Sequence, residues 1–461
     1  MNFPNVMEME IEHTNENITI SDVDGILEYN LNDVLATYEF YKKSLEKVEL
    51  RKLLSKQYNI PCINYSDSKI GESLILKLYS DETEQNPWDV KKLRSHRSEI
   101  ALKDCILDTI RFKSKHFNKL LEFLKSKVIQ ETKGAFAESV VYKGFKYDYG
   151  TGGIHGCIKP GIYEADDDYL IIDADVGSLY PSLAIVNNFY PEHLGPVFIN
   201  IYAGIIKMRL AAKKEGNSVL SDGLKLAANS VYGKSNDVNS FLYDPKFTMY
   251  ITLNGQLQLS MLAERFADQI PDLTVLQINT DGITIKIHKK YEELYYSICK
   301  DWEIETKLGL EYVYYSKMII ADVNNYIAVK TDGKCKYKGR FEIDKVVGSE
   351  PAYHKDNSFR IIPIALSDYF VKGIPVEQTI IEHTNIYDFC GRQKFKRDSY
   401  GQIHFLENNV EKIEKQQKNT RYYISNKGST FMKYYYKGTS EVINKGYSVT
   451  IFNKYTEKQI K

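Results

Sequence analysis

The sequence lacks long hydrophobic runs and paired cysteines. None of its apolar stretches approaches the ~20 residues of a bilayer-spanning helix, so we expect no membrane partner. Its six cysteines are scattered with no Cys-x-x-Cys pair, which argues against a zinc module and for a reducing, cytoplasmic environment. The first residues, Met1 to Val6, show neither the basic nor the apolar part of a secretory signal.

Net charge is missing as well, because 61 basic residues balance 61 acidic ones. The charges are segregated, however. Residues 1–33 carry eight acids and no Lys or Arg, whereas residues 391–461 carry fifteen Lys or Arg against six acids. A basic C-terminal part suits the binding of a phosphate backbone, although a solvated basic surface would have the same composition.

The length and composition are those of a globular protein with several subdomains. A chain of 461 residues is too long for one hydrophobic core, and 43% hydrophobic with 26% charged residues is typical of folded proteins. Tyr is abundant, with 36 residues against two Trp. It suits half-buried strands as well as nucleic-acid surfaces, so it decides nothing alone.

An apolar run from Leu170 to Asp175 is followed by a break at Gly177 and Pro181. This pattern predicts a buried strand that delivers a carboxylate at its end, which is one way to build a metal site. Alternation puts Asp173 and Asp175 on the same side of the strand, so periodicity does not separate them. An aspartate in this position can also simply cap the next helix.

Two later stretches add to this carboxylate. Lys225, Asn229 and Tyr232 are spaced to share one face of a helix. Leu276–Ile287 predicts two strands joined by a tight turn that carries Asp281. Two carboxylates and a cation are the groups needed for phosphoryl transfer with two magnesium ions.

Three stretches resemble, in the same order, motifs A, B and C of the family B (alpha-like) DNA polymerases: Asp175-x-x-Ser178-Leu179-Tyr180-Pro181, Lys225-x-x-x-Asn229-Ser230-x-Tyr232-Gly233 and Asn279-Thr280-Asp281. The resemblance covers the chain from about residue 140 onwards. It departs from the family at Asn279, where the usual first acid of motif C is absent. The resemblance implies an α+β, right-hand polymerase fold with palm, fingers and thumb, preceded by a mainly helical N-terminal part.

The resemblance also implies a division of the chain. The expected divisions are a remnant of a 3′–5′ exonuclease domain (1–56), a helical linker (57–139), a first palm segment with motif A (140–197), fingers with motif B (198–235), a second palm segment with motif C (236–357) and a thumb that is incomplete by comparison with the family (358–461). Helices are expected over about 26–56, within 112–128, twice within 198–235, and from Thr252 to Gln269.

The activity implied is that of a DNA-directed DNA polymerase, a nucleotidyltransferase acting in viral DNA replication. Asp175 and Asp281, with the carbonyl of Val176, are expected to hold two Mg²⁺ ions, for which Mn²⁺ can substitute; Asp173 is expected behind them. Lys225 is expected to be catalytic together with these two acids. The residues expected to bind the nucleotide are Ser178, Leu179, Tyr180, Arg209, Lys213, Lys225, Asn229 and Tyr232. For Arg209 and Lys213 alone, a solvated helix face is the alternative.

Primer–template DNA is the expected macromolecular partner. Gly152 and Gly153 lie where the family has a template-contacting motif, although Gly150 replaces its aromatic residue and a plain hairpin turn has the same sequence. The other expected DNA contacts are Tyr326, Lys338 in the stretch Lys336-Tyr-Lys338-Gly339, and Arg421. The two family cations before Tyr326 are replaced by Asn324 and Asn325.

Tyr29-Asn-Leu-Asn-Asp33 resembles the third exonuclease motif, although a plain surface helix explains it equally well. We expect it to be unable to proofread alone, which leaves room for a separate exonuclease chain or a processivity factor as partner. The short fingers suggest a bacteriophage protein in the host cytoplasm. The competing interpretation is a split or catalytically incomplete polymerase that binds primer–template as a subunit. Asn279 favours it, and the retained pair Asp175 and Asp281 opposes it.

Overall fold

The computed structural model describes residues 5–9, 11, 17–343 and 358–454. Helices and strands both contribute substantially, so the fold is of the expected α+β class. The chain forms two compact units. We call residues 46–336 the central unit, and residues 1–45 with 337–461 the terminal unit.

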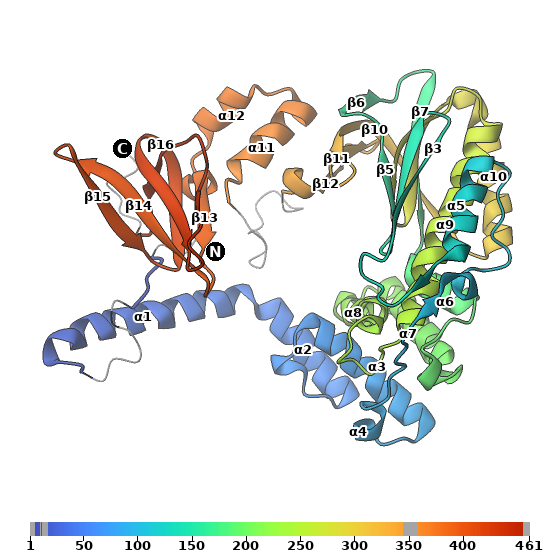
Figure 1. Cartoon of the computed structure of the whole chain (residues 1–461), viewed down its shortest axis with the longest axis horizontal. Helices are drawn as coiled ribbons and strands as arrows, with labels where there is room; N and C mark the ends of the chain where they lie inside the picture. The colour runs from blue at the N-terminus through green and yellow to red at the C-terminus, as the bar shows by residue number, and fades with distance from the viewer. Residues whose placement is uncertain (1–4, 10, 12–16, 344–357, 455–461) are drawn as a thin grey trace. The chain divides into compact units, whose positions relative to one another are not determined.

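One large antiparallel sheet organises the central unit, with strand order β12-β11-β10-β7-β9-β8-β5-β4-β3 and β6 paired to β10 (Figure 1). Its strands are β3 (Ala137–Tyr142), β4 (Phe145–Gly150), β5 (Ile154–Cys157), β6 (Gly161–Glu164), β7 (Tyr169–Val176), β8 (Thr274–Asn279), β9 (Gly282–His288), β10 (Leu310–Asp322), β11 (Asn325–Lys330) and β12 (Cys335–Lys338). The boundary between the units falls within β12. The strand that carries Asp175, β7, is therefore an inner strand of the sheet, with β10 on one side and β9 on the other.

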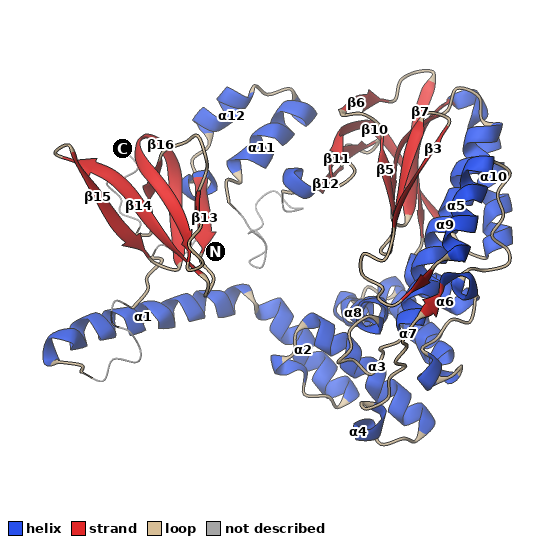
Figure 2. Cartoon of the chain, in the orientation of Figure 1, coloured by secondary structure: helices blue, strands red, loops and turns tan. Residues whose placement is uncertain are grey.

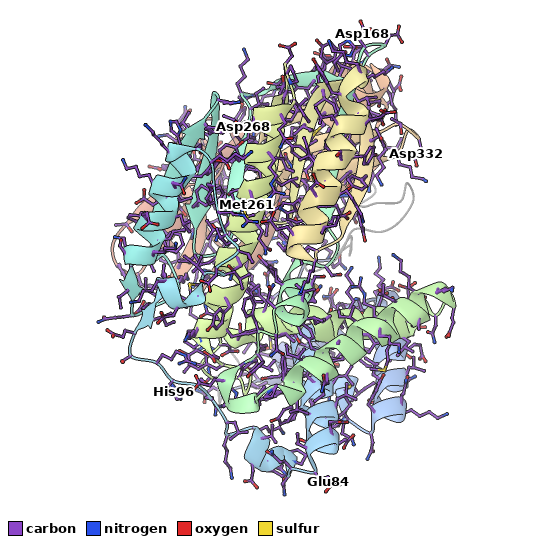
Figure 3. The ribbon with its side chains drawn as sticks, turned by 90° about the vertical axis from the view of Figure 1, so that its right-hand side faces the viewer. Glu84, His96, Asp168, Met261, Asp268 and Asp332 are labelled. Atoms are coloured by element: carbon purple, nitrogen blue, oxygen red, sulfur yellow. The ribbon has the colours of Figure 1, made fainter. Side chains whose placement is uncertain are left out.

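Helices cover one face of this sheet, as Figure 2 shows. They are α5 (Lys115–Ser126), α9 (Pro245–Gln269) and α10 (Glu292–Thr306). Figure 3 shows this face, with Met261 in the middle of α9 and Asp268 near its end. Residues all along α9 are buried, because the sheet and the other helices surround it. This packing supplies most of the core of the central unit.

A second group of helices packs together in the central unit. It consists of α2 (Leu45–Tyr58), α3 (Asp67–Thr83), α4 (Pro87–Val90), α6 (Leu179–Val186), α7 (Val197–Lys214) and α8 (Ser218–Ser235). The strands β1 (Ile100–Ala101) and β2 (Val128–Ile129) form a separate two-stranded antiparallel sheet. The Tyr202 hydroxyl donates to the Ala228 carbonyl at 2.8 Å and holds α7 against α8.

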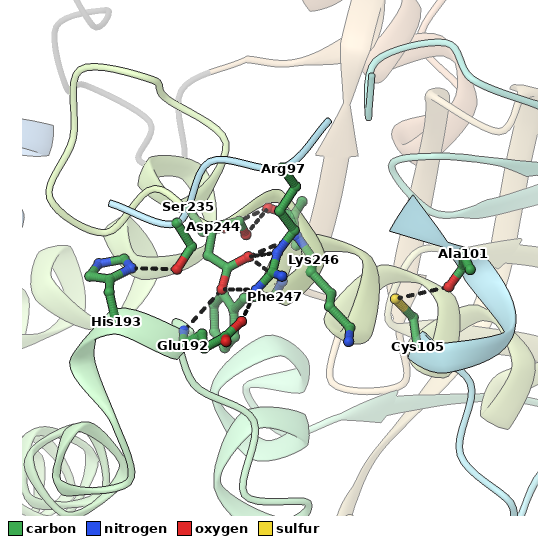
Figure 4. A network of polar contacts seen from close by, with 11 residues as sticks. Arg97, Ala101, Cys105, Glu192, His193, Ser235, Asp244, Lys246 and Phe247 are labelled. Atoms are coloured by element: carbon green, nitrogen blue, oxygen red, sulfur yellow. Dashed lines mark hydrogen bonds and ion pairs between the residues drawn. The ribbon is translucent and has the colours of Figure 1, made fainter. Parts of the chain in front are cut away.

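Asp244 fixes the start of α9 (Figure 4). It is 1% exposed and accepts hydrogen bonds from the amides of Lys246 at 3.0 Å and Phe247 at 3.4 Å. The amide of Glu192 donates to it at 2.9 Å, and Arg97 donates through Nε at 3.0 Å and Nη2 at 3.2 Å. Pro245 in the first turn needs no amide partner. The helix therefore begins at Pro245, before the expected Thr252.

The terminal unit contains a six-stranded sheet of order β13-β16-β14-β15, with β17 and β18 both paired to β16. Its elements are α1 (Ile20–Lys43), α11 (Ile361–Ser367), α12 (Val376–Glu382), β13 (Cys390–Lys394), β14 (Ser399–Glu407), β15 (Val410–Gln416), β16 (Asn419–Tyr435), β17 (Ser440–Val442) and β18 (Val449–Ile451). The acidic N-terminal stretch reaches this sheet. Asn5 bridges to Lys454, and the Lys418 amide donates to Glu8 at 2.7 Å. Acidic and basic ends of the sequence thus belong to one unit.

The single helix expected over 26–56 is divided into α1 and α2, because the helical conformation is interrupted at Ser44. The two helices expected within 198–235 and the hairpin around Asp281 are present. None of the helices in the described ranges combines the length and the apolar surface that crossing a bilayer requires.

Candidate functional site

The site lies where β7 ends. Asp175 is the penultimate residue of β7, and the Val176 amide donates to the Asp281 carbonyl at 2.7 Å. Asp281 sits in the turn between β8 and β9, and Thr280 takes the left-handed conformation with φ 58°. Two carboxylates that are far apart in sequence are therefore held at the same end of two neighbouring strands.

Strand register decides what lies beside Asp175. On one side it pairs with Gly282 of β9, and on the other with Glu311 of β10. A Cβ built at Gly282 would lie 1.9 Å from Asp175 Oδ1, so only glycine leaves space for this carboxylate. Glu311 adds a third acid that sequence reasoning missed, because only the register of β10 against β7 reveals it.

Asp173 has a different environment on the same side of β7. It is 5% exposed and accepts hydrogen bonds from Thr284 Oγ1 at 2.6 Å and from the Tyr315 hydroxyl at 3.0 Å. Its oxygens are thus engaged by neutral donors from β9 and β10. This geometry suits a carboxylate that supports the site from behind.

Lys336 of β12 carries the cation nearest to these acids in the described part of the chain. Its Nζ lies 3.8 Å from Asp173 Oδ2 and 3.9 Å from Asp175 Oδ2. Burial opposes the positive charge, but Asp173, the Tyr326 hydroxyl and Asp175 outweigh it and raise the pKa of the ammonium. The sequence indicated Lys336 only as one of several cations after the β10–β11 hairpin.

The carboxyl of Asp175 is crowded by negative charge. Burial, then the charge of Asp173, raises its pKa to about 7; Lys336 opposes the shift, and Asp281 and Glu311 add to it. Within the described part of the chain no hydrogen bond reaches this carboxylate, although its side chain is only 37% exposed. Such an under-neutralised carboxylate is typical of a functional site.

Two tyrosines from different helices meet beside the carboxylates. Tyr180 of α6 and Tyr232 of α8 have ring centroids 4.2 Å apart, at an angle of 39°. The Tyr180 hydroxyl donates to the Gly152 carbonyl at 3.3 Å, and burial raises its pKa. A Cβ built at Gly153 would lie 3.3 Å from Thr280 Oγ1. The three motif stretches and the glycine turn between β4 and β5 therefore converge.

The cationic side chains lie on the α7–α8 hairpin. Lys213, Lys225 and Asn229 are exposed, and Arg209 is half-buried. Arg209 lies about two turns beyond Tyr202, and Lys225 about one turn before Ala228, so both lie towards the connection of the hairpin. The Arg209 Nε atom is shielded from solvent and has no hydrogen-bond partner among the described residues. An anion would satisfy it.

Ser178 and Leu179 begin α6. Ser178 adopts the left-handed conformation with φ 51°, which turns the chain sharply from β7 into the helix. The first amides of a helix have no carbonyl partner within it, and they favour an anion. Both residues are thus in a position to offer amides next to Asp175.

Asn279, where the resemblance leads one to expect an acid, is held by the β10–β11 turn. Its Nδ2 donates to the Val323 carbonyl at 3.1 Å, and its Oδ1 accepts from Thr280 Oγ1 at 3.3 Å. A carboxylate could not donate to Val323. The Asn279 amide thus joins the β8–β9 turn to the β10–β11 turn.

Two of the expected DNA contacts need correction. Tyr326 is 3% exposed, because β11 turns it into a cluster with Tyr315 and Met318, so its ring is not on a surface. Arg421 is 7% exposed and packs over Tyr387 and Phe452, with Nε donating to the Phe452 carbonyl at 2.7 Å. The basic sequence around Arg421 could not show this, since burial depends on strands far along the chain. Lys338 is exposed, as expected.

The side chains at the end of β7 offer oxygen ligands for a divalent ion. Among the described residues no three His, Cys, Asp or Glu side chains are arranged as a ready-made ligand set. The candidate ligands at the end of β7 are nevertheless all oxygen donors, namely the carboxylates of Asp175 and Asp281 and the carbonyl of Val176, and the Lys336 ammonium lies beside them. Together with the crowded charge of Asp175, this donor set fits a hard cation such as Mg²⁺.

Comparison with known proteins gives a structural likeness alone. No protein-family model matches the chain, and no curated protein does either. One matching solved structure is the family B DNA polymerase from the hyperthermophilic archaeon Pyrobaculum calidifontis, with TM-score 0.41 and 14% identity, over 82% of this chain and 47% of that one. The chain thus spans about half the length of that polymerase.

Proposed function

We propose that the chain is a DNA-directed DNA polymerase that extends a primer 3′-hydroxyl with deoxynucleoside triphosphates on a DNA template. The observation that carries the proposal is the meeting of four separate stretches at one point. Asp175 lies against Gly282 and Asp281, and Tyr180 against Tyr232 and Gly152. The order and identity of these residues are those of the polymerase motifs, which a structural protein would not need.

In this proposal Asp175, Asp281 and the Val176 carbonyl hold two Mg²⁺ or Mn²⁺ ions. When bound, such ions activate the attacking hydroxyl and neutralise the leaving pyrophosphate. Asp173, which is held by its bonds from Thr284 and Tyr315, lies behind Asp175 and adds negative charge to the site. The negative charges that gather around Asp175 favour the binding of divalent cations at this point.

The triphosphate is bound by Arg209, Lys213 and Lys225, of which Lys225 is also catalytic, and by the amides of Ser178 and Leu179. The Arg209 Nε atom, which has no partner among the described residues, supports this assignment. Charge placed in advance where negative charge develops lowers the barrier, so Lys225→Ala should slow turnover by about 10²–10³-fold.

Shape and stacking define the rest of the nucleotide site. Tyr180 lies under the sugar, where its ring excludes a 2′-hydroxyl, and Tyr232 lies near the nascent base pair. Their mutual packing supports this pair as one wall. Asn229 lines the exposed face of α8 beside the nucleotide. Template DNA passes the turn at Gly152 and Gly153, and Lys338 contacts the duplex.

Two further parts of the proposal concern the viral type of the polymerase and its protein partners. The connection between α7 and α8 is short, from Lys214 to Ser218, which supports compact fingers of the kind found in viral polymerases. Tyr29 and Asp33 lie about one turn apart on α1, and burial and then the Asp33 carboxylate raise the pKa of the Tyr29 hydroxyl. We propose no proofreading by this pair alone, and a separate exonuclease chain or processivity factor as partner.

Primer extension tests the proposal directly. The purified chain, a short primer–template, Mg²⁺ and the four nucleotides should give extension that falls by more than about a hundredfold in Asp175→Ala. Asp166→Ala is the matched control, because Asp166 is an exposed acid in the turn before β7. Extension by Asp175→Ala at the wild-type rate would refute the site.

The same experiment separates the alternative. If the wild-type chain extends nothing but binds duplex DNA with strong salt dependence, the chain is a DNA-binding subunit that needs a partner for catalysis. The replacement of the motif C acid by Asn279, which is bound to Val323, is the observation that favours this outcome.

A further inference from the structure

Lys336 occupies an unusual position for a lysine. It projects from β12 towards the end of β7, with its ammonium between Asp173 and Asp175 at 3.8 and 3.9 Å. The Tyr326 hydroxyl also favours its charged form. The hairpin that carries it is closed by a bond of 2.8 Å from the Lys330 amide to the Lys334 carbonyl. Lys336 is therefore held in this place by its own strand.

Asp173 does not need this lysine. Its oxygens already accept bonds of 2.6 and 3.0 Å from Thr284 and Tyr315, both shorter than the distance to Lys336. Asp175 has no such donors in the described part of the chain. The ammonium therefore lies beside both carboxylates, of which Asp175 is the one without hydrogen-bond donors in the described part of the chain.

The surrounding charges are unbalanced. Four carboxylates influence this point, those of Asp173, Asp175, Asp281 and Glu311, against the single charge of Lys336. Within the described residues no other cation forms an ion pair with Asp173 or Asp175. A divalent ion bound by Asp175 must share this small volume with the ammonium, and like charges at such distances repel.

We propose that Lys336 is a resident counter-ion of the catalytic carboxylates, which occupies the metal position in part when no divalent ion is bound and weakens the binding of the first ion. The inference rests on the proposed metal site at Asp175 and Asp281. Lys336 acts through Asp175 and is thus a positioning residue. It keeps the acids together before substrate arrives and makes tight occupation depend on the additional ligands that a triphosphate brings.

The proposal predicts a direction that structural damage would not produce. Removing the ammonium leaves the cluster more negative, so Lys336→Met should bind a divalent ion more tightly, whereas a distorted site would bind it more weakly. Lys336→Arg retains the charge and should behave like the wild type. Lys334→Met is the matched control, since Lys334 is exposed and pairs with Asp332 in the turn.

The experiment measures Mn²⁺ binding to the full chain by calorimetry at pH 8, without DNA or nucleotide. We expect the Kd to fall about tenfold in Lys336→Met, to stay unchanged in Lys334→Met and Lys336→Arg, and to become unmeasurable in Asp175→Asn. Lys336→Gln is a second neutral variant should Lys336→Met not fold, as judged by circular dichroism.

The outcomes are distinguishable. An unchanged or weaker Kd in a folded Lys336→Met or Lys336→Gln overturns the counter-ion role while leaving the metal site intact. Absence of Mn²⁺ binding in the wild type and in both neutral variants overturns the inference together with the proposed metal site. Tighter binding in the neutral variants alone supports both.

Discussion

Asp244 and Asp175 are two acids of the central unit that each face a basic side chain, and they differ in how fully their oxygens are satisfied. Asp244 accepts bonds from three backbone amides and from two nitrogens of Arg97 (Figure 4). Asp175 has a lysine at 3.9 Å and three other acids nearby. A carboxylate whose oxygens all accept hydrogen bonds stabilises the fold. A carboxylate with few donors keeps oxygens that can bind a ligand.

The difference follows from where the two acids stand. Asp244 precedes a helix, where free amides and the helix dipole favour a carboxylate. Asp175 stands at the end of a central strand whose neighbours supply Gly282 and Glu311. Burial alone therefore does not distinguish a structural from a functional carboxylate, but the number of donors does.

The largest effect on stability should come from Asp244→Ala. It removes the cap of α9 and leaves Arg97 short of its buried partner, so we expect the free energy of unfolding to fall by about 3–5 kcal/mol. Thermal and urea unfolding of the purified chain measure this. The control is Asp89→Ala, which removes an exposed ion pair with Lys92 at 2.9 Å and should cost no more than about 1 kcal/mol.

Equal losses in the two variants would contradict the comparison, because Asp244 would then contribute no more than a surface ion pair. The start of α9 would in that case be fixed by its apolar packing alone.

A smaller effect is expected at Asn279. Asn279→Asp places an acceptor opposite the Val323 carbonyl in place of the donor, and should lower stability by about 1–3 kcal/mol. Asn324→Asp adds the same charge to an exposed position of the neighbouring turn and is the control. Thermal unfolding of both variants provides the measurement. If Asn279→Asp melts with the wild type, the amide is not needed to hold this turn.

Much of this arrangement was accessible from the sequence. The strand before Asp175 and the hairpin at Asp281 follow from local periodicity and turn residues, and the spacing of Lys225, Asn229 and Tyr232 predicted α8. The pairing of α7 with α8 was an implication of the family resemblance. The early start of α9 also had a local signal in Asp244-Pro245, a capping residue followed by a proline suited to the first turn, which the prediction overlooked.

The remaining features depend on register and burial. Glu311 reaches the site because of the register in which β10 pairs with β7, and Lys336 because of the register of β12 next to β11. A shift of one residue in either register would turn the side chain to the other face of the sheet. The surroundings of Tyr326 and Arg421 are likewise set by distant strands. A sequence without its sheet register cannot give these contacts, although it names the residue types.

The last prediction concerns the dependence of stability on pH that the charge state of Asp175 causes. The pKa of the Asp175 carboxyl rises from its ordinary value of 3.8 to about 7 in the folded chain, because of burial and the charge of Asp173. Between these two pH values the folded protein holds a proton that the unfolded chain has lost, so this group's contribution to stability declines as pH rises from about 4 to 7.

Asp175→Asn removes that decline. In the absence of metal, we expect the variant to melt close to the wild type at pH 5 and above it at pH 8, with Mg²⁺ narrowing the difference at pH 8. A constant difference across this range would mean that the pKa of Asp175 is not raised in the folded chain, and the contrast with the fully hydrogen-bonded Asp244 would be lost.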